Sequence, residues 1–185
     1  MSTWVQGSYF IGRKSAEETQ SIHDFLGELW TDAIPRVSGT AVFLTTNYNT
    51  PLALKHFVEH AHVLHEQVVL MTIVSSNLPV VPASRQIRVE WLPDGVWKIT
   101  ALCGFMESPN IPRFLERAKT QGFNFDAEQT TYFARRTSVV PTGISKMSSW
   151  RKRLYATLSR NSVDATRSFS LPPDRVVDFG AQVEL

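Results

Sequence analysis

The distribution of apolar residues predicts a strand, a helix and a second strand in succession. Residues 39–47 read GTAVFLTTN, an apolar run rich in residues that favour strands. Thr50 is suited to cap a helix that has Pro51 at its first position. Residues 67–74, QVVLMTIV, are nearly all apolar, as expected of a strand covered on both faces. This order predicts a right-handed crossover and a parallel pair of strands.

Further along the chain the pattern changes to alternation of apolar and polar residues. Ile87, Val89 and Trp91 alternate with polar residues, and alternation resumes in residues 97–101 after the turn sequence Pro-Asp-Gly at 93–95. This arrangement predicts an antiparallel hairpin. The same reasoning predicts helices over 111–122 and 147–161, the second of them amphipathic, and strands over 130–137 and within 174–185.

Together these elements predict an α/β fold, a single domain with a mixed β-sheet flanked by helices. In chain order, the domain is expected to start with the parallel strand-helix-strand unit and to have the antiparallel hairpin in the middle. Residues 1–35 are predicted to form an entry segment and a helix, and residues 36–185 the α/β domain. With 185 residues, of which 43% are hydrophobic and 19% charged, the chain has a globular composition and can bury a sizeable core.

Composition also limits the cellular compartments and the classes of binding partner that the chain is expected to have. The single cysteine, Cys103, cannot form an internal disulfide, which fits a reducing compartment. It has no neighbouring base or CxxC partner, so we expect it to be a small core residue. No run approaches the roughly 20 apolar residues that span a bilayer, and we expect a soluble, cytoplasmic chain. The net charge of only +2 argues against a nucleic-acid partner.

The sequence HFVEHAHVLHE, residues 56–66, contains four of the five histidines. Its start fits H-x-x-E-H, a pattern in which two imidazoles bind zinc and a carboxylate activates the bound water of a peptidase. On a helix, however, the apolar side chains of this region share one face, which packs inward and consists of Leu54, Phe57, Val58 and Ala61. His56, Glu59 and His60 then point toward solvent.

We therefore expect solvated or structural histidines, with His56 and His60 as weak metal candidates. Adventitious metal capture and a zinc-dependent hydrolase that uses HFVEH are the alternatives. His65 is expected beyond the helix, near the turn into the next strand, where a ring nitrogen can satisfy buried backbone groups.

The chain lacks the common nucleotide-binding and hydrolase motifs GxGxxG, GxxxxGK[ST] and GxSxG, so we predict neither enzymatic activity nor a cofactor. A nucleotide can still bind such a fold, because strand ends and helix N-termini supply amide donors for phosphate. The candidate residues are Thr45, Thr46 and Asn47 at the end of the first strand, together with Arg135 and Arg136. An ordinary polar loop is the alternative.

A second charged feature is a stretch without acidic residues between Glu128 and Asp164. Its basic residues are Arg135, Arg136, Lys146, Arg151, Lys152, Arg153 and Arg160. Such local positive charge suits anionic lipid headgroups, at about 1 kcal/mol per basic residue near the surface, or a phosphate-bearing ligand. The alternative is a solvated helix face whose charges pair with acidic residues elsewhere in the fold.

Six sequence blocks are distinctive when they are taken in order. They are GTAVFLTTN, LHEQVVLMTIV, GFMESPNIPRFL, TTYFARRT, WRKRLYATLSRN and LPPDRVVDFGAQVEL, within residues 39–185. Together they resemble the C-terminal hydrophilic domain of the Kup/HAK/KT family of potassium uptake transporters. WVQGSYFI and HDFL resemble that family's segment just after its last membrane helix, which implies that residues 1–35 are membrane-proximal. His60, His65 and Glu66 fall at family-like positions, whereas Glu59 stands where the family tends to carry a basic residue.

The resemblance implies that the chain is part of a larger protein whose membrane helices take up potassium, in bacteria together with protons. This domain is then expected on the cytoplasmic side of the inner membrane, beside the membrane domain of the same transporter. The residues that bind and conduct potassium belong to those helices, and none of them can be assigned to a position here.

Three roles are compatible with such a regulatory or assembly domain. Its basic helix, with Arg151, Lys152, Arg153 and Arg160, could lie against anionic lipids of the inner leaflet or against the transporter's membrane domain. The resemblance also implies an adenine nucleotide or a cyclic dinucleotide as a ligand. A homodimer could form through the edge of the hairpin or through the C-terminal strand.

Overall fold

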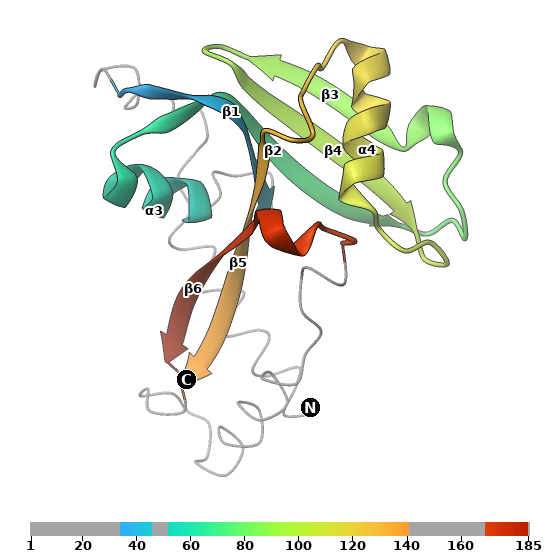
Figure 1. The fold of residues 1–185 in the computed structure, drawn as a ribbon. Helices are drawn as coiled ribbons and strands as arrows, with labels where there is room; N and C mark the ends of the chain where they lie inside the picture. Colours follow the sequence, from blue (N-terminus) through green and yellow to red (C-terminus); the bar gives the residue numbers. More distant parts are fainter. Residues whose placement is uncertain (1–33, 46–51, 141–168, 185) are drawn as a thin grey trace.

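One six-stranded β-sheet organises the chain, with its strands in the order β3-β4-β2-β1-β5-β6 (Figure 1). The computed structural model describes residues 34–45, 52–140 and 169–184. β3 and β4 are antiparallel, and every other neighbouring pair is parallel. The predicted mixed α/β fold is therefore confirmed. The elements are β1 (Arg36–Thr45), α3 (Leu52–Ala61), β2 (Leu64–Ser76), η1 (Ala83–Arg85), β3 (Ile87–Leu92), β4 (Val96–Gly104), α4 (Ile111–Ala118), η2 (Lys119–Gln121), β5 (Thr130–Val140), η3 (Pro173–Arg175) and β6 (Val176–Glu184).

The first three elements form the parallel strand-helix-strand unit that the sequence predicts. β1 and β2 run side by side in register, with Phe43 beside Leu70 and Thr45 beside Thr72. β2 begins at Leu64, three residues before the predicted run, because the Leu64 side chain is buried in the core beneath α3. The apolar residues of both strands are covered on both faces, which explains why neither strand shows alternation.

The predicted hairpin is formed by β3 and β4. Trp91 and Trp97 face each other just before and after the turn. Asp94 and Gly95 adopt φ angles of 58° and 74°, the left-handed conformations that a tight hairpin turn requires. Gly95 also has no room for a side chain, because a Cβ would lie 2.3 Å from the backbone oxygen of Glu66.

The two helices cover opposite faces of the sheet. The connections from β1 to β2 and from β4 to β5 run in opposite directions along the sheet, so right-handed crossovers place α3 and α4 on different faces. The core accordingly has two halves. The α3 half contains Ala41, Phe43, Ala53, Leu54, Val58, Leu64, Val68, Leu70, Val96 and Phe133. The α4 half contains Val42, Val69, Met71, Ile87, Ile99, Ala101, Ile111, Phe114, Leu115, Ala118, Phe123, Tyr132 and Leu171.

The second helix, α4, has clear start and stop signals. The side chain of Asn110 caps it by accepting a hydrogen bond from the backbone N–H of Arg113 at 2.9 Å. Pro112 occupies the first turn, where a missing N–H costs nothing. The α-helix ends at Ala118 and continues as the short η2, which Gly122 terminates with a φ of 91°. The predicted helix over 111–122 is thus confirmed, with its last turn tightened.

The two C-terminal strands extend beyond the rest of the sheet. Pairing between β1 and β5 stops at Phe43 and Phe133, whereas β5 and β6 stay paired from Tyr132 beside Val176 as far as Val140 beside Glu184. Beyond Phe133 these two strands form a two-stranded parallel ribbon, visible at the lower left of Figure 1. We call residues 134–140 and 178–184 the ribbon. The predicted last strand is confirmed.

Some predicted elements lie outside the described residues. These are the entry segment and helix before residue 34 and the amphipathic helix over 147–161. The division into an entry segment and an α/β domain therefore stays a prediction. Neither of the two α-helices of the described residues is long and apolar enough to cross a membrane.

Candidate functional site

Of the predicted nucleotide-binding residues, Thr45, Arg135 and Arg136 lie in described strands of the sheet. Thr45 ends β1, while Thr46 and Asn47 lie outside the described residues. Arg135 and Arg136 lie in β5, and their backbone pairs with Phe179 and Gly180 of β6. Thr45, the last residue of β1, and Arg135, within β5, each stand two positions past the last pair between these strands, so they lie at the same level of neighbouring strands. Topology thus brings two parts of the predicted site to the same level of the sheet, where β1 ends and β5 continues beside β6.

Strand register adds a polar row beside Thr45 that the sequence did not reveal. Thr45 pairs with Thr72, Thr72 pairs with Thr100, and Thr100 pairs with Arg88. Residues paired in a sheet point to the same face, so three hydroxyls and one guanidinium cross four strands in a line. The Arg88 guanidinium already pairs with Glu90 at 2.9 Å. Such a row can be found only when strand order and register are known.

The histidine-rich helix presents its polar side to solvent, as predicted. His56, Glu59 and His60 are exposed, and the carboxylate of Glu59 lies 3.8 Å from the Lys55 ammonium and 3.6 Å from Nδ1 of His56. Within the described residues, no group of three or more histidine, cysteine or acidic side chains is arranged to hold a metal ion.

One detail of the predicted helix face is wrong. Ala61, which we expected on the inward face, is exposed, and Ala53 is buried instead. The helix ends at Ala61, and His62 adopts a φ of 53° in the turn that leads into β2.

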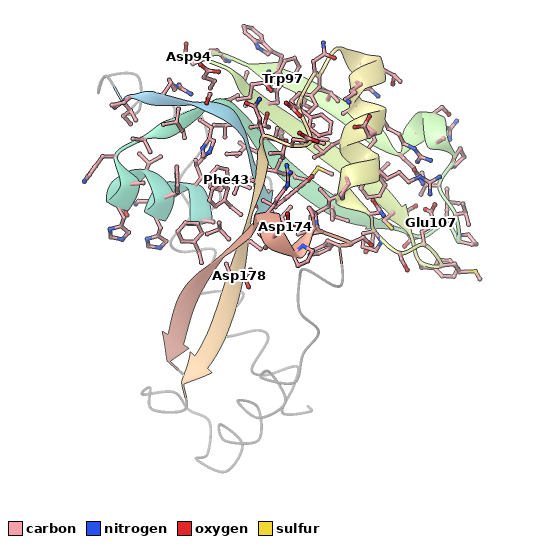
Figure 2. The ribbon with its side chains drawn as sticks, in the orientation of Figure 1. Phe43, Asp94, Trp97, Glu107, Asp174 and Asp178 are labelled. Atoms are coloured by element: carbon pink, nitrogen blue, oxygen red, sulfur yellow. The ribbon has the colours of Figure 1, made fainter. Side chains whose placement is uncertain are left out.

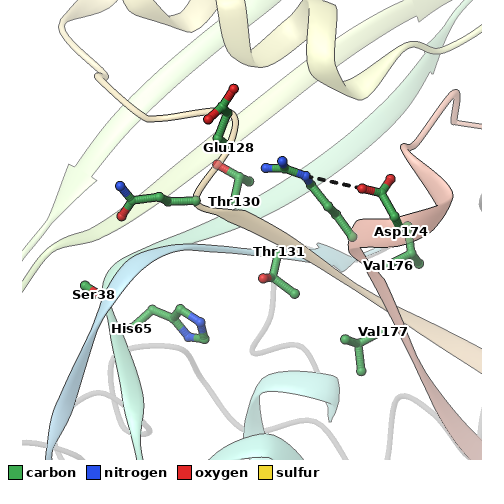
Figure 3. Close-up of a pocket in the computed structure, with 10 residues that line it drawn as sticks. Ser38, His65, Glu128, Thr130, Thr131, Asp174, Val176 and Val177 are labelled. Atoms are coloured by element: carbon green, nitrogen blue, oxygen red, sulfur yellow. Dashed lines mark ion pairs between the residues drawn. The ribbon is translucent and has the colours of Figure 1, made fainter.

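A pocket of about 520 Å³ lies at the other end of the sheet, where β1, β5 and β6 begin (Figure 3). Its lining consists of Ser38, His65, Glu128, Gln129, Thr130, Thr131, Asp174, Arg175, Val176 and Val177. Ligands of open α/β sheets usually bind at the carboxyl ends of the strands, so the amino-end position is uncommon for this fold class.

The charges of the pocket do not favour a phosphate ligand. Arg175 is the single Lys or Arg side chain of the lining, and its Nε lies 3.7 Å from a carboxylate oxygen of Asp174 (Figure 3). The same guanidinium donates a hydrogen bond to the backbone oxygen of Ala127. Glu128 adds a second carboxylate. With two carboxylates against one guanidinium that is already bonded, the pocket suits a small polar molecule better than an anion.

His65 forms the apolar end of this pocket. Its ring lies 5.8 Å from that of Phe57 and 5.9 Å from that of Phe133. Its Nδ1 is buried and has no hydrogen-bond partner among the described residues, which corrects our expectation that a ring nitrogen would satisfy buried backbone groups. The expectation failed because His65 is part of β2, where its backbone already pairs with β1 and its side chain points at aromatic rings.

Burial of the His65 ring lowers the pKa of this imidazole below its usual value of 6.5. The folded chain then binds a proton less readily than the unfolded chain, so folding stability is fully present above pH 6.5 and is lost as pH falls through the lowered pKa. We expect the urea midpoint to drop between pH 7.5 and pH 5.5. His65→Phe should reduce this drop, whereas His56→Gln, at an exposed position, should retain it. A His65→Phe profile that matches the unchanged chain would contradict the assignment.

Cys103 is the small core residue that the sequence predicts. It is 6% exposed, and its Sγ lies 3.5 Å from the backbone oxygen of Glu107. Burial, with the nearby charge of Glu107, raises the pKa of the thiol, so the reactive thiolate is disfavoured.

Comparison with known proteins identifies the family. Residues 38–185 match the family described as the K+ potassium transporter C-terminal domain, and the chain belongs to this family. The resemblance inferred from the six sequence blocks is thereby confirmed. No solved structure matches the chain.

Curated relatives agree with this family. The chain is 44% identical over 187 residues to a probable potassium transport system protein Kup of Nitrosomonas eutropha, covering 100% of this chain and 29% of the relative. A Kup protein of Myxococcus xanthus is 43% identical, with 100% and 28% covered, and Kup 2 of Chromobacterium violaceum is 38% identical, with 100% and 30% covered. The chain thus spans less than a third of the length of these relatives.

Proposed function

We propose that this chain is the regulatory and assembly domain of a potassium uptake transporter and that it lies on the cytoplasmic side of the inner membrane. The whole protein would take up potassium, together with protons, through membrane helices outside this chain. Family membership and the relatives, which are probable potassium transport system proteins, support the transport role. The observation that carries the assembly role is the ribbon formed by β5 and β6.

A two-stranded ribbon is only marginally stable in water without further strands or a covering layer. Beyond Phe133, β5 has lost β1 as a neighbour, and β6 is the last strand of the described sheet. The outer edge of β6 therefore offers a row of backbone N–H and C=O groups that suits pairing with another strand.

The opposite edge of the sheet is closed in a different way. The Gln121 side chain accepts a hydrogen bond from the N–H of Val89 at 3.2 Å and donates one to the carbonyl of Ile87 at 2.9 Å. This amide occupies one N–H and one C=O that an added strand would need along β3. Of the two edges considered for a homodimer, the C-terminal strand is therefore favoured over the hairpin.

The expected partner is a second copy of this chain. Two β6 strands related by a two-fold axis pair antiparallel, which gives each copy the same interface and closes the assembly at two subunits. Such pairing would hold two transporters together and couple their cytoplasmic parts.

Hydrogen exchange at two protein concentrations, with sedimentation to give the mass, tests this proposal. We expect a dimer at the higher concentration and slower exchange of backbone amides in Val176–Glu184. Amides in Ile87–Leu92 should exchange at the same rate at both concentrations and serve as the internal control. A monomer throughout, or protection confined to Ile87–Leu92, would contradict the proposal.

Two neighbouring proline substitutions sharpen the test. Successive backbone N–H groups of a strand point to opposite sides, so of Gln182→Pro and Val183→Pro one removes a hydrogen bond to β5 and the other removes a donor on the outer edge. The outer-edge variant should keep the thermal stability of the monomer and lose the dimer. The other proline variant, which lacks a hydrogen bond to β5, should lose thermal stability as well.

A nucleotide-sensing role is the second candidate. In its favour, Thr45 ends β1 and Arg135 lies at the same level of the neighbouring β5, and phosphate ligands of open sheets commonly bind where strands end. The same exchange experiment, repeated with ATP, AMP and cyclic di-AMP, tests it, because a bound nucleotide should protect the peptide that contains Thr45. Unchanged exchange at that peptide with all three nucleotides would remove this candidate.

A further inference from the structure

Two loops at the carboxyl ends of β2 and β4 expose large apolar side chains together. Leu78 and Val80, after β2, are 49% and 61% exposed, and Phe105 and Met106, after β4, are 65% and 74% exposed. We call these four residues the apolar tip. The loops touch, because the N–H of Phe105 donates to the carbonyl of Leu78 and that of Met106 to the carbonyl of Pro79, each at 3.1 Å. Four adjacent exposed apolar side chains indicate an interaction surface.

The carboxylate of Glu107 holds the two loops of the apolar tip in place. Glu107 accepts hydrogen bonds from the N–H of Gly104 at 2.8 Å, the N–H of Val81 at 3.1 Å and the side-chain amide of Gln86 at 2.8 Å. These bonds, first among them the one from Gly104, lower the pKa of the Glu107 carboxyl and keep it ionised. Both loops are therefore tied to one anchor, so the four side chains are presented by ordered backbone.

The charges beside the apolar tip are one-sided. In residues 77–86 and 104–113 the charged side chains are Arg85, Glu107 and Arg113. The carboxylate of Glu107 is taken up by three N–H donors, whereas both arginines lie in the segments that flank the tip. Exposed apolar side chains with cations beside them, and no free carboxylate in the same segments, match the surface of an anionic bilayer.

We propose that the apolar tip docks on an anionic lipid surface, with Phe105 and Met106 entering the headgroup region and Arg85 and Arg113 facing the lipid phosphates. This inference rests on the proposed function, since a domain of a potassium transporter is tethered beside a bilayer. Lipid is favoured over a protein partner for two reasons. A bilayer can receive side chains from two separate loops without a complementary pocket, and its acyl boundary suits the apolar side chains while its phosphates suit the arginines.

Vesicle co-sedimentation of this chain tests the proposal, with phosphatidylcholine vesicles that contain phosphatidylglycerol as the probe. We expect the chain to sediment with these vesicles. The double variant Phe105→Ser with Met106→Ser should bind them at least about tenfold more weakly, because it removes most of the apolar area of one loop. Both positions are exposed, so the variant should keep the thermal midpoint of the unchanged chain.

Trp91→Ser provides the matched control. Trp91 is 64% exposed, close to the 65% of Phe105, but it stands beside the hairpin turn. Asp94 of that turn and Glu107 lie at opposite ends of the hairpin strands (Figure 2). The Trp91→Ser variant should therefore bind vesicles as the unchanged chain does.

Two outcomes would overturn the proposal. One is that the unchanged chain stays in the supernatant at millimolar lipid. The other is that the double variant binds as tightly as the unchanged chain, which would assign binding to a different surface. Dimer formation through the ribbon is measured separately on the same variants, so loss of lipid binding with an intact dimer leaves the assembly role standing.

Discussion

Replacing Phe43 with alanine is expected to lower the free energy of unfolding by about 3–5 kcal/mol, the range for removing a buried phenyl ring. Phe43 is 0% exposed and lies two residues before the end of β1. Its ring stacks on that of Phe133 in β5, with centroids 4.6 Å apart, and lies 5.9 Å from that of Phe57 in α3. It therefore joins two strands and a helix, and none of these elements can close the cavity without moving away from another.

Urea unfolding, with the m-value fitted separately for each variant, measures this loss of unfolding free energy. Phe105→Ala is the matched control, because the same ring is removed from a position that is 65% exposed, where the change should stay within about 0.5 kcal/mol. A loss below about 1 kcal/mol for Phe43→Ala, or one equal to that of Phe105→Ala, would show that the aromatic cluster is not the centre of the α3 half of the core.

Gly104→Ala is the second substitution with a large expected effect, about 3 kcal/mol or more, at the upper end of what overpacking costs. A Cβ on Gly104 would lie 2.3 Å from the backbone oxygen of Pro79 and 2.9 Å from that of Leu78. These backbone atoms cannot move aside freely, because the two loops are hydrogen-bonded to each other and to Glu107. Amide exchange in residues 77–82 should become faster along with the loss of stability.

Gly180→Ala provides the control for the glycine substitution. No described atom lies within 4 Å of a Cβ built there, and its backbone is not in the left-handed region. The control should therefore change the free energy of unfolding by no more than about 0.5 kcal/mol. If Gly104→Ala behaved like Gly180→Ala, the close approach between the loops after β2 and β4 would be ruled out.

Local signals in the sequence were sufficient for most elements of the fold. The Pro-Asp-Gly turn and the alternation around Val89 specify the hairpin, and Pro112 with Gly122 bounds the helix α4 and its last turn. The strand order was not predictable in the same way. Nothing near Thr130 indicates that the connection from β4 crosses β2 and β1 and that β5 pairs with the far side of β1, since that choice depends on which strand edges remain free in the folded sheet.

The functional surfaces were harder to predict because they join distant parts of the chain. The pocket brings His65 beside Thr131 and Arg175, and no local pattern links those three positions. Glu107 looks like an ordinary loop carboxylate in GFMES, since its three donors are identified only by the folded backbone. The exposure of Phe105 could not be predicted either, because the sequence does not indicate whether an apolar side chain in a loop points into the core or to solvent.

The central position of β1 has a consequence for the order in which the chain folds. Its pairing with β2 joins Thr40 to Gln67, whereas its pairing with β5 joins Thr40 to Thr130, 90 positions later in the chain. Closing the longer loop costs more chain entropy, so β5 should dock after the segment from β1 to β4 has formed. Until then β1 is an edge strand with unpaired backbone groups, and the Phe43 ring lacks its neighbour Phe133. Aggregation during refolding should begin there, and substitutions in β5 should raise it more than substitutions in the hairpin.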